Sequence, residues 1–412
     1  MAERKTEAIF LYKKGWKPPQ AQIRVGTVRL PIEAQMKYLG LTLDGTWCFK
    51  EHMSRLVPRL RVVSANVGRL MPNIGGPGWK ARRLHAGILN SVALYGAPVW
   101  AESLDASRPM QAQLRKAHRA VAVRVARCYR TLSHVAATTL AGMPPLELLA
   151  LIYRTMYIRK RELLQQGEAN EALAGAIRRM KHQARLVLLQ RWQRILANAR
   201  YGRRTVESVQ RCLQQWVGRA FGTLTFRMTQ VLTGHGCFGE YLCRIGKGHT
   251  ATCHHCGHDH DSAQHTLQDC PAWSAERRVM IREIGRDLLL PTIVGAIVGN
   301  ERKWEVFASF CEAVISQKEV AEEDRREAEG RCRRRRRRER HRLWRGDRSR
   351  SSEGDVNSSE EDEMRMVGSP SPPPQPAPSP AIVTTEKGSE EGGAAGGDSR
   401  CLNQPSQRRM AG

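Results

Sequence analysis

Cysteine and histidine residues between Cys253 and Cys270 are the side chains with the clearest capacity for chemistry in this sequence. Cys253 and Cys256 are separated by two residues, so their thiolates can take adjacent vertices of a zinc tetrahedron. His265 and Cys270 supply the other two ligands of a Cys₃His site. Four protein ligands leave no open position, so the spacing predicts a structural Zn²⁺ whose binding free energy folds a polar segment. Two alternatives stay open: no metal binds, or a ligand is replaced by one of the neighbouring histidines, His249, His254, His255, His258 and His260.

The remaining cysteines do not indicate a disulfide framework. The chain has 11 cysteines, an odd number, and its first residues lack the apolar segment of a secretory signal peptide. No stretch reaches the roughly 18 consecutive apolar residues that a membrane span needs. The sequence therefore favours an intracellular protein whose partners do not include a membrane.

The sequence offers no catalytic centre. Two-metal phosphoryl transfer needs acidic side chains that converge on divalent cations. The acids before residue 329 are mostly isolated among basic residues, and no Asp-Asp pair occurs. Residues 234–239 match the dinucleotide-binding motif G-x-G-x-x-G. Such a site also needs an acidic residue about twenty positions further on, within a βαβ unit, and the Cys/His cluster occupies that place instead. We therefore predict a turn-rich loop there and assign no catalytic residue.

An excess of positive charge indicates polyanionic partners. Lys and Arg number 67 against 40 Asp and Glu, a net charge of +27. Residues after 330 contribute 17 basic and 12 acidic side chains, a net charge of +5. The first 330 residues therefore carry a net charge of +22. Nine basic and no acidic residues lie between Arg178 and Arg204, which favours phosphate contact over ion pairing within the helix, although solvation of a helix surface is the alternative for any single arginine. The candidate contacts with RNA or DNA are Lys37, Tyr38, Arg115, Lys116, Arg119, Arg178, Arg179, Lys181 and Arg185.

Hydrophobic periodicity predicts a mainly α fold. Short N-terminal antiparallel strands precede an Arg-rich helical bundle, a small Cys₃His zinc module and a disordered C-terminal tail. Strands are expected at residues 8–12, 23–32 and 38–43. Helices are expected at residues 53–70 with a kink at Pro58, 84–94, 109–128, 146–166, 172–199, 206–217, 273–289 and 304–315.

Composition changes divide the chain into six segments. They are strands at 1–48, a helical region at 49–129, a helical linker at 130–232, the zinc module at 233–275, C-terminal helices at 276–328 and a tail at 329–412. The tail is Arg-rich, then acidic, then Pro-rich, and such sequence cannot form a packed core. The location is expected to be nuclear or cytoplasmic, and twelve arginines between 331 and 350 favour the nucleus. A nucleic-acid-binding tract and a solvated run of charge are the alternatives for these arginines.

A series of short segments resembles successive landmarks of non-LTR retrotransposon reverse transcriptases, in particular the site-specific arthropod type. The resemblance covers about residues 3 to 320. Its landmarks are KTEA at 5–8, KYLGLTLD at 37–44, SVALYGAPVW at 91–100, AGMPPL at 141–146, TGHG at 233–236, and the set Cys253, Cys256, His265 and Cys270 followed by Pro271 and Trp273.

The resemblance implies a role for each segment. Residues 5–7 would follow the catalytic palm strands, residues 37–44 would lead from palm to thumb near the primer terminus, and residues 49–129 would be thumb-like and grip the template-primer duplex. The Cys₃His set would correspond to the family's zinc-knuckle-like ligands. The catalytic acids and the upstream polymerase and endonuclease domains would precede residue 1. Mg²⁺ would therefore belong only to the parent polymerase.

We thus expect a nucleic-acid-binding C-terminal fragment of such a reverse transcriptase, inactive alone, whose parent carries out target-primed reverse transcription. One alternative is that the chain forms part of an active RNA-directed DNA polymerase in a longer product. Another is that the chain is a domesticated zinc-containing interaction protein. The sequence does not indicate an oligomeric state.

Overall fold

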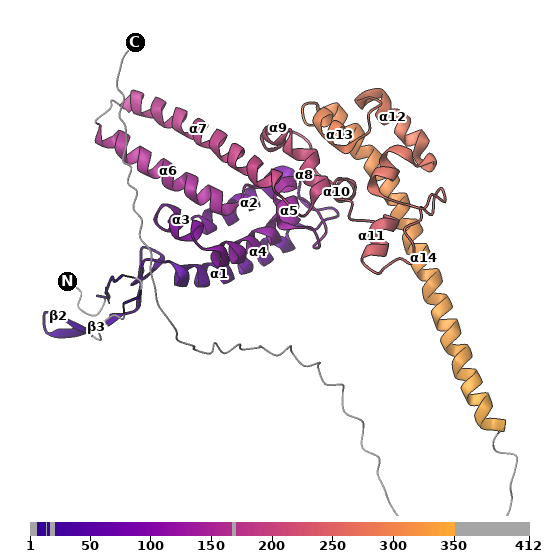
Figure 1. Cartoon of the computed structure of the whole chain (residues 1–412), viewed down its shortest axis with the longest axis horizontal. Coiled ribbons are helices and arrows are strands. Elements are labelled where there is room, and N and C mark those ends of the chain that lie inside the picture. Colours follow the sequence, from indigo (N-terminus) through magenta and orange to yellow (C-terminus); the bar gives the residue numbers. More distant parts are fainter. Residues whose placement is uncertain (1–5, 14, 17–20, 167–169, 351–412) are drawn as a thin grey trace, which may run out of the picture. The chain divides into compact units, whose positions relative to one another are not determined.

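The computed structural model describes residues 6–13, 15, 16, 21–166 and 170–350 of the chain (Figure 1). Two units are distinguished, Met1–His341 and Arg342–Gly412, and the elements below belong to the first of them apart from the end of the last helix. Residues 351–412, which hold most of the predicted tail, lie outside the described residues.

Three short strands near the N-terminus form one sheet. They are β1 (Ala8–Ile9), β2 (Gln22–Val25) and β3 (Val28–Glu33), in the order β1-β3-β2. The strand expected at residues 23–32 is instead an antiparallel hairpin of β2 and β3. The expected antiparallel pairing is wrong for β1, which runs parallel to β3 with Ala8 opposite Ile32. Parallel pairing needs a long connection, and the chain between β1 and β3 provides one because it includes β2.

The predicted strand at residues 38–43 is instead a hairpin. It consists of β4 (Gln35–Tyr38) and β5 (Leu41–Asp44), which pair antiparallel. Leu39 and Gly40 between them have φ of 47° and 82°, and two successive positive φ values are typical of a tight hairpin turn. The Tyr95 hydroxyl donates a hydrogen bond of 2.8 Å to the Leu39 carbonyl, so the turn is tied to the helical part of the chain.

Helices make up most of the described chain, which confirms the mainly α prediction. The first seven are α1 (Lys50–Arg69), α2 (Trp79–Ala93), α3 (Ala97–Asp105), α4 (Arg108–Val125), α5 (His134–Ala141), α6 (Leu146–Gln165) and α7 (Asn170–Ala197). The others are α8 (Arg203–Gln210), α9 (Leu213–Gly218), α10 (Phe226–Thr233), α11 (Gly239–Arg244), α12 (Ser274–Ile284), α13 (Leu290–Ile297) and α14 (Glu301–Arg350).

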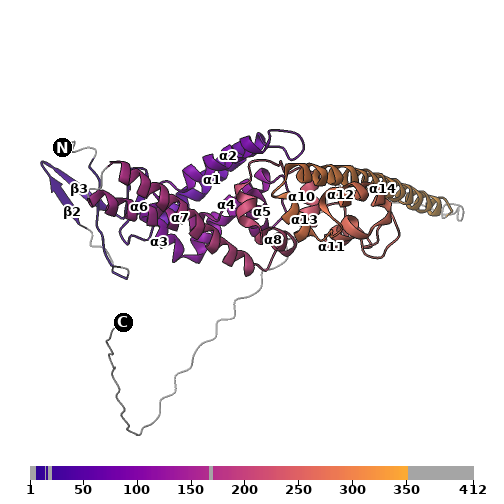
Figure 2. The ribbon, with the colours of Figure 1, turned by 90° about the horizontal axis from the view of Figure 1, so that it is seen from above.

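Long helices pair along their lengths. Helices α6 and α7 lie side by side, as do α1 and α4 (Figure 1). Helix α14 lies beside α10, α12 and α13 in both views (Figure 2).

Among the described helices none is by itself long and apolar enough for a membrane span; α5 and α6, bent by 58°, reach that length and composition only as a pair.

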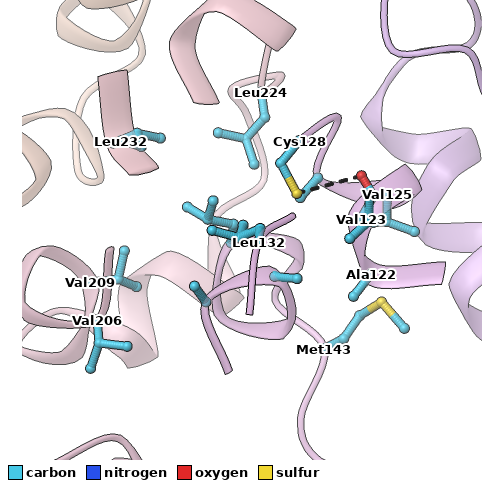
Figure 3. Packing of buried hydrophobic residues seen from close by; sticks show 14 of the residues in the cluster. Ala122, Val123, Val125, Cys128, Leu132, Met143, Val206, Val209, Leu224 and Leu232 are labelled. Carbon is cyan, nitrogen blue, oxygen red and sulfur yellow. Dashed lines mark hydrogen bonds between the residues drawn. The ribbon is translucent and has the colours of Figure 1, made fainter. Parts of the chain in front are cut away.

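One hydrophobic cluster holds these helices together. It extends from Leu41 to Ile315 and includes side chains from each of the predicted segments between residues 49 and 328. Figure 3 shows part of it, where the Cys128 sulfur points to the Val123 carbonyl and Leu132 belongs to the same cluster as Val206 and Val209 from a later helix. Trp192 and Trp216 are 1% and 0% exposed, so they serve the core and are not available to stack on bases.

The predicted start of the tail at residue 329 does not coincide with a break in structure. Helix α14 continues through this position to Arg350. Arg326 pairs with Glu322 at 2.8 Å and Arg331 with Glu327 at 3.3 Å, both one helical turn apart. Such pairs and the high helix propensity of Arg and Glu extend the helix where hydrophobic periodicity has already ended.

Asp44 joins the hairpin to the first helix. Its carboxylate, which is 8% exposed, accepts hydrogen bonds from the Thr46 hydroxyl at 2.7 Å, the Cys48 amide at 3.1 Å and the Phe49 amide at 2.6 Å. Burial raises the pKa of Asp44, but these hydrogen bonds outweigh burial and hold the pKa below its usual 3.8. The ionised carboxylate therefore stabilises the loop before α1.

Replacing Asp44 should destabilise the protein. We expect Asp44→Ala to lower the free energy of unfolding by about 1–3 kcal/mol, because buried amide donors lose their acceptor. The folded-state pKa is lowered, so this stabilisation is present above pH 3.8 and is lost as pH falls through the folded-state pKa. Urea denaturation across pH measures both effects. Asp105→Ala, at an exposed position, is the control, and an equal loss of stability in the two variants would contradict the role of Asp44.

Candidate metal centre and basic surfaces

Four side chains predicted as zinc ligands come together in the structure. One ligand atom from each of Cys253, Cys256, His265 and Cys270 lies within 4.8 Å of all the others. The Sγ atoms of Cys253 and Cys270 are 3.9 Å apart, and Cys256 Sγ is 3.3 Å from His265 Nε2. A zinc tetrahedron with Zn–S bonds of about 2.3 Å places two sulfurs about 3.8 Å apart, so the spacing is compatible with Zn²⁺.

The local backbone explains why these residues converge. The Cys253 amide donates to the His258 carbonyl at 2.7 Å, and the Gly257 amide donates to the Cys253 carbonyl at 2.8 Å, which closes a tight turn under the first two ligands. Gly257 has φ of 77°, a conformation that favours glycine. The π-helical turn η2 (His265–Asp269) leads into the fourth ligand, and the Cys270 amide donates to the His265 carbonyl at 2.8 Å.

Arg277 on α12 fixes the segment between the last two ligands. Its guanidinium is buried and donates to the carbonyls of Leu267 at 3.0 Å and Cys270 at 2.7 Å, and a longer bond reaches Thr266. No carboxylate takes part in these bonds. Arg277 therefore holds the shape of the ligand loop through backbone carbonyls.

A buried ion pair connects the ligand loop to α14. Lys318 Nζ lies 2.8 Å and 2.9 Å from the two carboxylate oxygens of Asp261, and both side chains are almost completely buried. Asp261 also accepts a hydrogen bond of 2.9 Å from the Gly239 amide at the start of α11. One carboxylate thus joins α11, the loop between the cysteine pair and His265, and α14.

The chemistry of the thiols fits a cation. Burial, and then the neighbouring Cys253, raise the pKa of the Cys270 thiol to about 12, and burial also raises the pKa of Cys253. Burial lowers the pKa of His265, which keeps its imidazole neutral and able to act as a ligand. A bound Zn²⁺ deprotonates such thiols outright, so it would replace the burial cost with strong metal–thiolate attraction.

The neighbouring histidines do not form a rival set. Within the described ranges, the Cys₃His group is the single cluster of three or more Cys, His, Asp or Glu side chains close enough to hold a metal. The His258 ring stacks on His265 with 4.7 Å between ring centres, and the ring centres of His255 and Trp273 are 4.8 Å apart.

The segment 234–239 begins at the C-terminal end of α10 and leads into α11, so no strand precedes the G-x-G-x-x-G match.

The predicted nucleic-acid contacts fall into two classes. Arg115 pairs with Glu147 at 2.7 Å, and Arg119 donates to the carbonyls of Leu132 and Arg130, so these two guanidinium groups have structural partners. The other candidates are exposed, with no side-chain hydrogen bond or ion pair to another described residue: Lys37 and Tyr38 on β4, Lys116 on α4, and Arg178, Arg179, Lys181 and Arg185 on α7.

Sequence reasoning missed a groove between α1 and α4. Five arginines line it, with no acidic residue: Arg61, Arg69, Arg119, Arg124 and Arg130. Except for Arg119, their guanidinium groups have no hydrogen-bond or ion-pair partner in the part of the chain that the structure describes. The sequence places arginines on the polar faces of both helices, but it does not tell which of those faces meet.

Comparison with known proteins relates the chain to transposable elements. It is 26% identical over 324 residues to the putative 115 kDa protein in type-1 retrotransposable element R1DM of Drosophila melanogaster, an alignment that covers 76% of this chain and 31% of that protein. It is 25% identical over 315 residues to the retrovirus-related Pol polyprotein from type-1 retrotransposable element R1 4 of Nasonia vitripennis, covering 73% of this chain and 76% of that protein. No protein-family model and no solved structure matches the chain.

Loss of one ligand should release the metal. We expect the purified protein to hold one Zn²⁺ per chain and Cys256→Ser to lose it, because the remaining ligands no longer close the tetrahedron. Hydrogen exchange should then rise near residues 235–275 while the upstream helices stay protected. Elemental analysis measures the metal, with the exposed Cys243→Ser as control. Stoichiometric zinc in Cys256→Ser would show that the assigned ligand set is wrong.

Removing the partner of Asp261 should destabilise the protein strongly. Lys318→Met leaves a buried carboxylate without its counter-charge, at a cost of about 3–5 kcal/mol in the free energy of unfolding. The double variant Asp261→Asn with Lys318→Met should recover part of this loss, since no buried charge remains. Chemical denaturation provides the measurement, and Lys303→Met on the same helix is the control. Equal stability of Lys318→Met and Lys303→Met would contradict the stabilising role of the Asp261–Lys318 pair.

Proposed function

We propose that this chain, a non-LTR retrotransposon-related protein, binds nucleic acid through arginine-lined surfaces of its helical part, with Zn²⁺ holding the Cys₃His module in shape. The observation that carries the proposal is the groove between α1 and α4, which we call the α1–α4 groove. It has a volume of about 450 Å³ and is lined by five arginines and no acid.

Phosphate is the ligand that suits the α1–α4 groove. Like-charged guanidinium groups repel one another, so their gathering without a carboxylate raises the free energy of the unliganded groove. A phosphodiester backbone supplies negative charge at regular spacing and accepts paired hydrogen bonds from arginine. Such contacts give affinity without reading the base sequence.

A second basic surface follows α7. Arg178, Arg179, Lys181 and Arg185 are exposed there, and Lys181 also lines a depression of about 370 Å³ between α6 and α7. Tyr153 and Tyr157 line the same depression and are 43% and 50% exposed. Exposed aromatic rings among basic side chains support binding of single strands, because bases stack on the rings while phosphates meet the cations.

The relatives suggest a wider context for this activity. The Nasonia relative carries the name of a Pol polyprotein, and the chain spans less than a third of the length of the Drosophila relative. We propose that the chain corresponds to the C-terminal part of a reverse transcriptase and positions RNA and DNA for target-primed reverse transcription in its parent. As a second candidate, we propose that it forms part of an active RNA-directed DNA polymerase in a longer product, which would supply the acids for Mg²⁺.

Neutralising the α1–α4 groove should weaken nucleic-acid binding. We expect Arg61→Ala with Arg69→Ala to lower affinity for a labelled DNA duplex. The slope of log K against log salt should become shallower by roughly 2, because each phosphate that an arginine no longer neutralises removes about 0.9 from it. Fluorescence anisotropy across a KCl series gives both quantities.

The matched control is Arg278→Ala with Arg282→Ala, which removes two exposed arginines from α12 and leaves the groove intact. It carries the same reduction of net charge. An equal effect of the two double variants would show that net charge rather than the groove determines binding, and no binding by the unmodified protein at low salt would refute the proposed function.

A further inference from the structure

A small cavity lies where α2 begins, beside the turn after α5 and the end of α9; we call it the α2–α9 cavity. Its volume is about 40 Å³. Three arginines and two tryptophans line it together with small and apolar side chains, and no acidic residue is among them: the charged and aromatic residues are Trp79, Arg82, Arg83, Trp216 and Arg219. The cavity is separate from the α1–α4 groove, with which it shares no lining residue.

Arg82 supplies a buried and uncompensated charge to this cavity. Its side chain is 1% exposed, and its guanidinium donates to three backbone carbonyls, those of Pro72, Pro77 and Arg124. Carbonyl oxygens satisfy the donors but do not cancel the charge. Burial, and then Arg127 and Arg124, lower the pKa of Arg82 to about 10, so the group is still protonated at neutral pH.

Arg219 is held in place, and one of its guanidinium nitrogens is buried without an acceptor in the described chain. Its guanidinium carbon lies 4.2 Å from the ring centre of Trp216 and 4.8 Å from that of Trp304, and the group donates to the Trp216 carbonyl. The Nε atom is buried and has no hydrogen-bond partner among the described residues. A buried N–H without an acceptor costs free energy that a ligand oxygen would recover.

Arg83 completes the set from the exposed side. Its guanidinium lies 5.4 Å from the Trp79 ring centre and has no hydrogen-bond or ion-pair partner in the described chain, so it can turn toward a ligand. Its charge is near enough to help lower the pKa of Arg219, after burial, to about 10. The first turn of α2 has neither an acidic residue nor a side-chain cap, so the amides there add to the positive potential.

We propose that the α2–α9 cavity binds the terminal phosphate of a polynucleotide, held by Arg83 and Arg219 in the field of Arg82. The volume has room for about three water-sized spheres, which matches the three terminal oxygens of a phosphate monoester. An internal phosphodiester is less suited, because its chain must leave in two directions. Trp79 at the edge of the cavity provides a ring for the terminal base. The choice of a polynucleotide as the source of the phosphate rests on the proposed function.

Oligonucleotides of one sequence, each carrying its fluorescent label on an internal base, test this proposal. Anisotropy compares a strand with hydroxyl groups at both ends, a strand with a 5′-phosphate and a strand with a 3′-phosphate. We expect one phosphorylated end to raise affinity roughly ten- to a hundredfold, the range of a charged hydrogen-bond pair. Arg83→Gln should abolish this gain and leave the affinity for the hydroxyl-ended strand nearly unchanged. Lys80→Gln, an exposed neighbour on α2 that does not line the cavity, should keep the gain.

Two outcomes of the strand comparison overturn the proposal: equal affinity for all three strands, and a gain that survives Arg83→Gln. Isothermal titration with inorganic phosphate separates the sources. Arg83-dependent binding of phosphate without a gain for either phosphorylated strand assigns the cavity to free phosphate and overturns the polynucleotide assignment. If the hydroxyl-ended strand does not bind but a phosphorylated strand does, the proposed function of the basic surfaces fails while the cavity assignment stands.

Discussion

Hydrogen bonds from arginine to backbone carbonyls tie distant segments of this structure together around its hydrophobic core. Arg82, Arg119, Arg204 and Arg277 all join segments in this way. A carboxylate partner would neutralise each guanidinium, whereas a carbonyl satisfies its donors and leaves the charge in place. The same bonds that hold the fold therefore maintain a positive potential, which links the stability of the helical part to its proposed affinity for polyanions.

The Cys₃His module depends on its surroundings as much as on its ligands. Arg277 shapes the segment before Cys270, and the buried Asp261–Lys318 pair ties the loop between Cys256 and His265 to α14. A zinc ion would set the distances among four side chains, whereas the ion pair fixes the module against the rest of the chain. Metal binding and the packing of α14 should therefore be coupled, since both determine the position of the loop between Cys256 and His265.

Much of this organisation could be predicted from local sequence. Helix α6 occurs within one residue of its expected bounds because Pro144 and Pro145 precede a long amphipathic run. The four candidate metal ligands could be predicted because they lie close together in the sequence. The relation to non-LTR retrotransposon proteins, expected from short landmarks, is confirmed by the two relatives. Short buried helices such as α5 were missed because their Ala and Thr residues show no polar face. The Asp261–Lys318 pair and the α1–α4 groove join residues far apart in sequence, and no local pattern predicts such contacts.

The salt dependence of binding to a DNA duplex tests the central claim most directly. If arginines of the α1–α4 groove contact phosphates, a plot of log K against log salt for the unmodified protein should be linear with a slope of roughly −4 to −5, about −0.9 for each of five arginines. A slope near zero, or no binding at low ionic strength, would contradict the account.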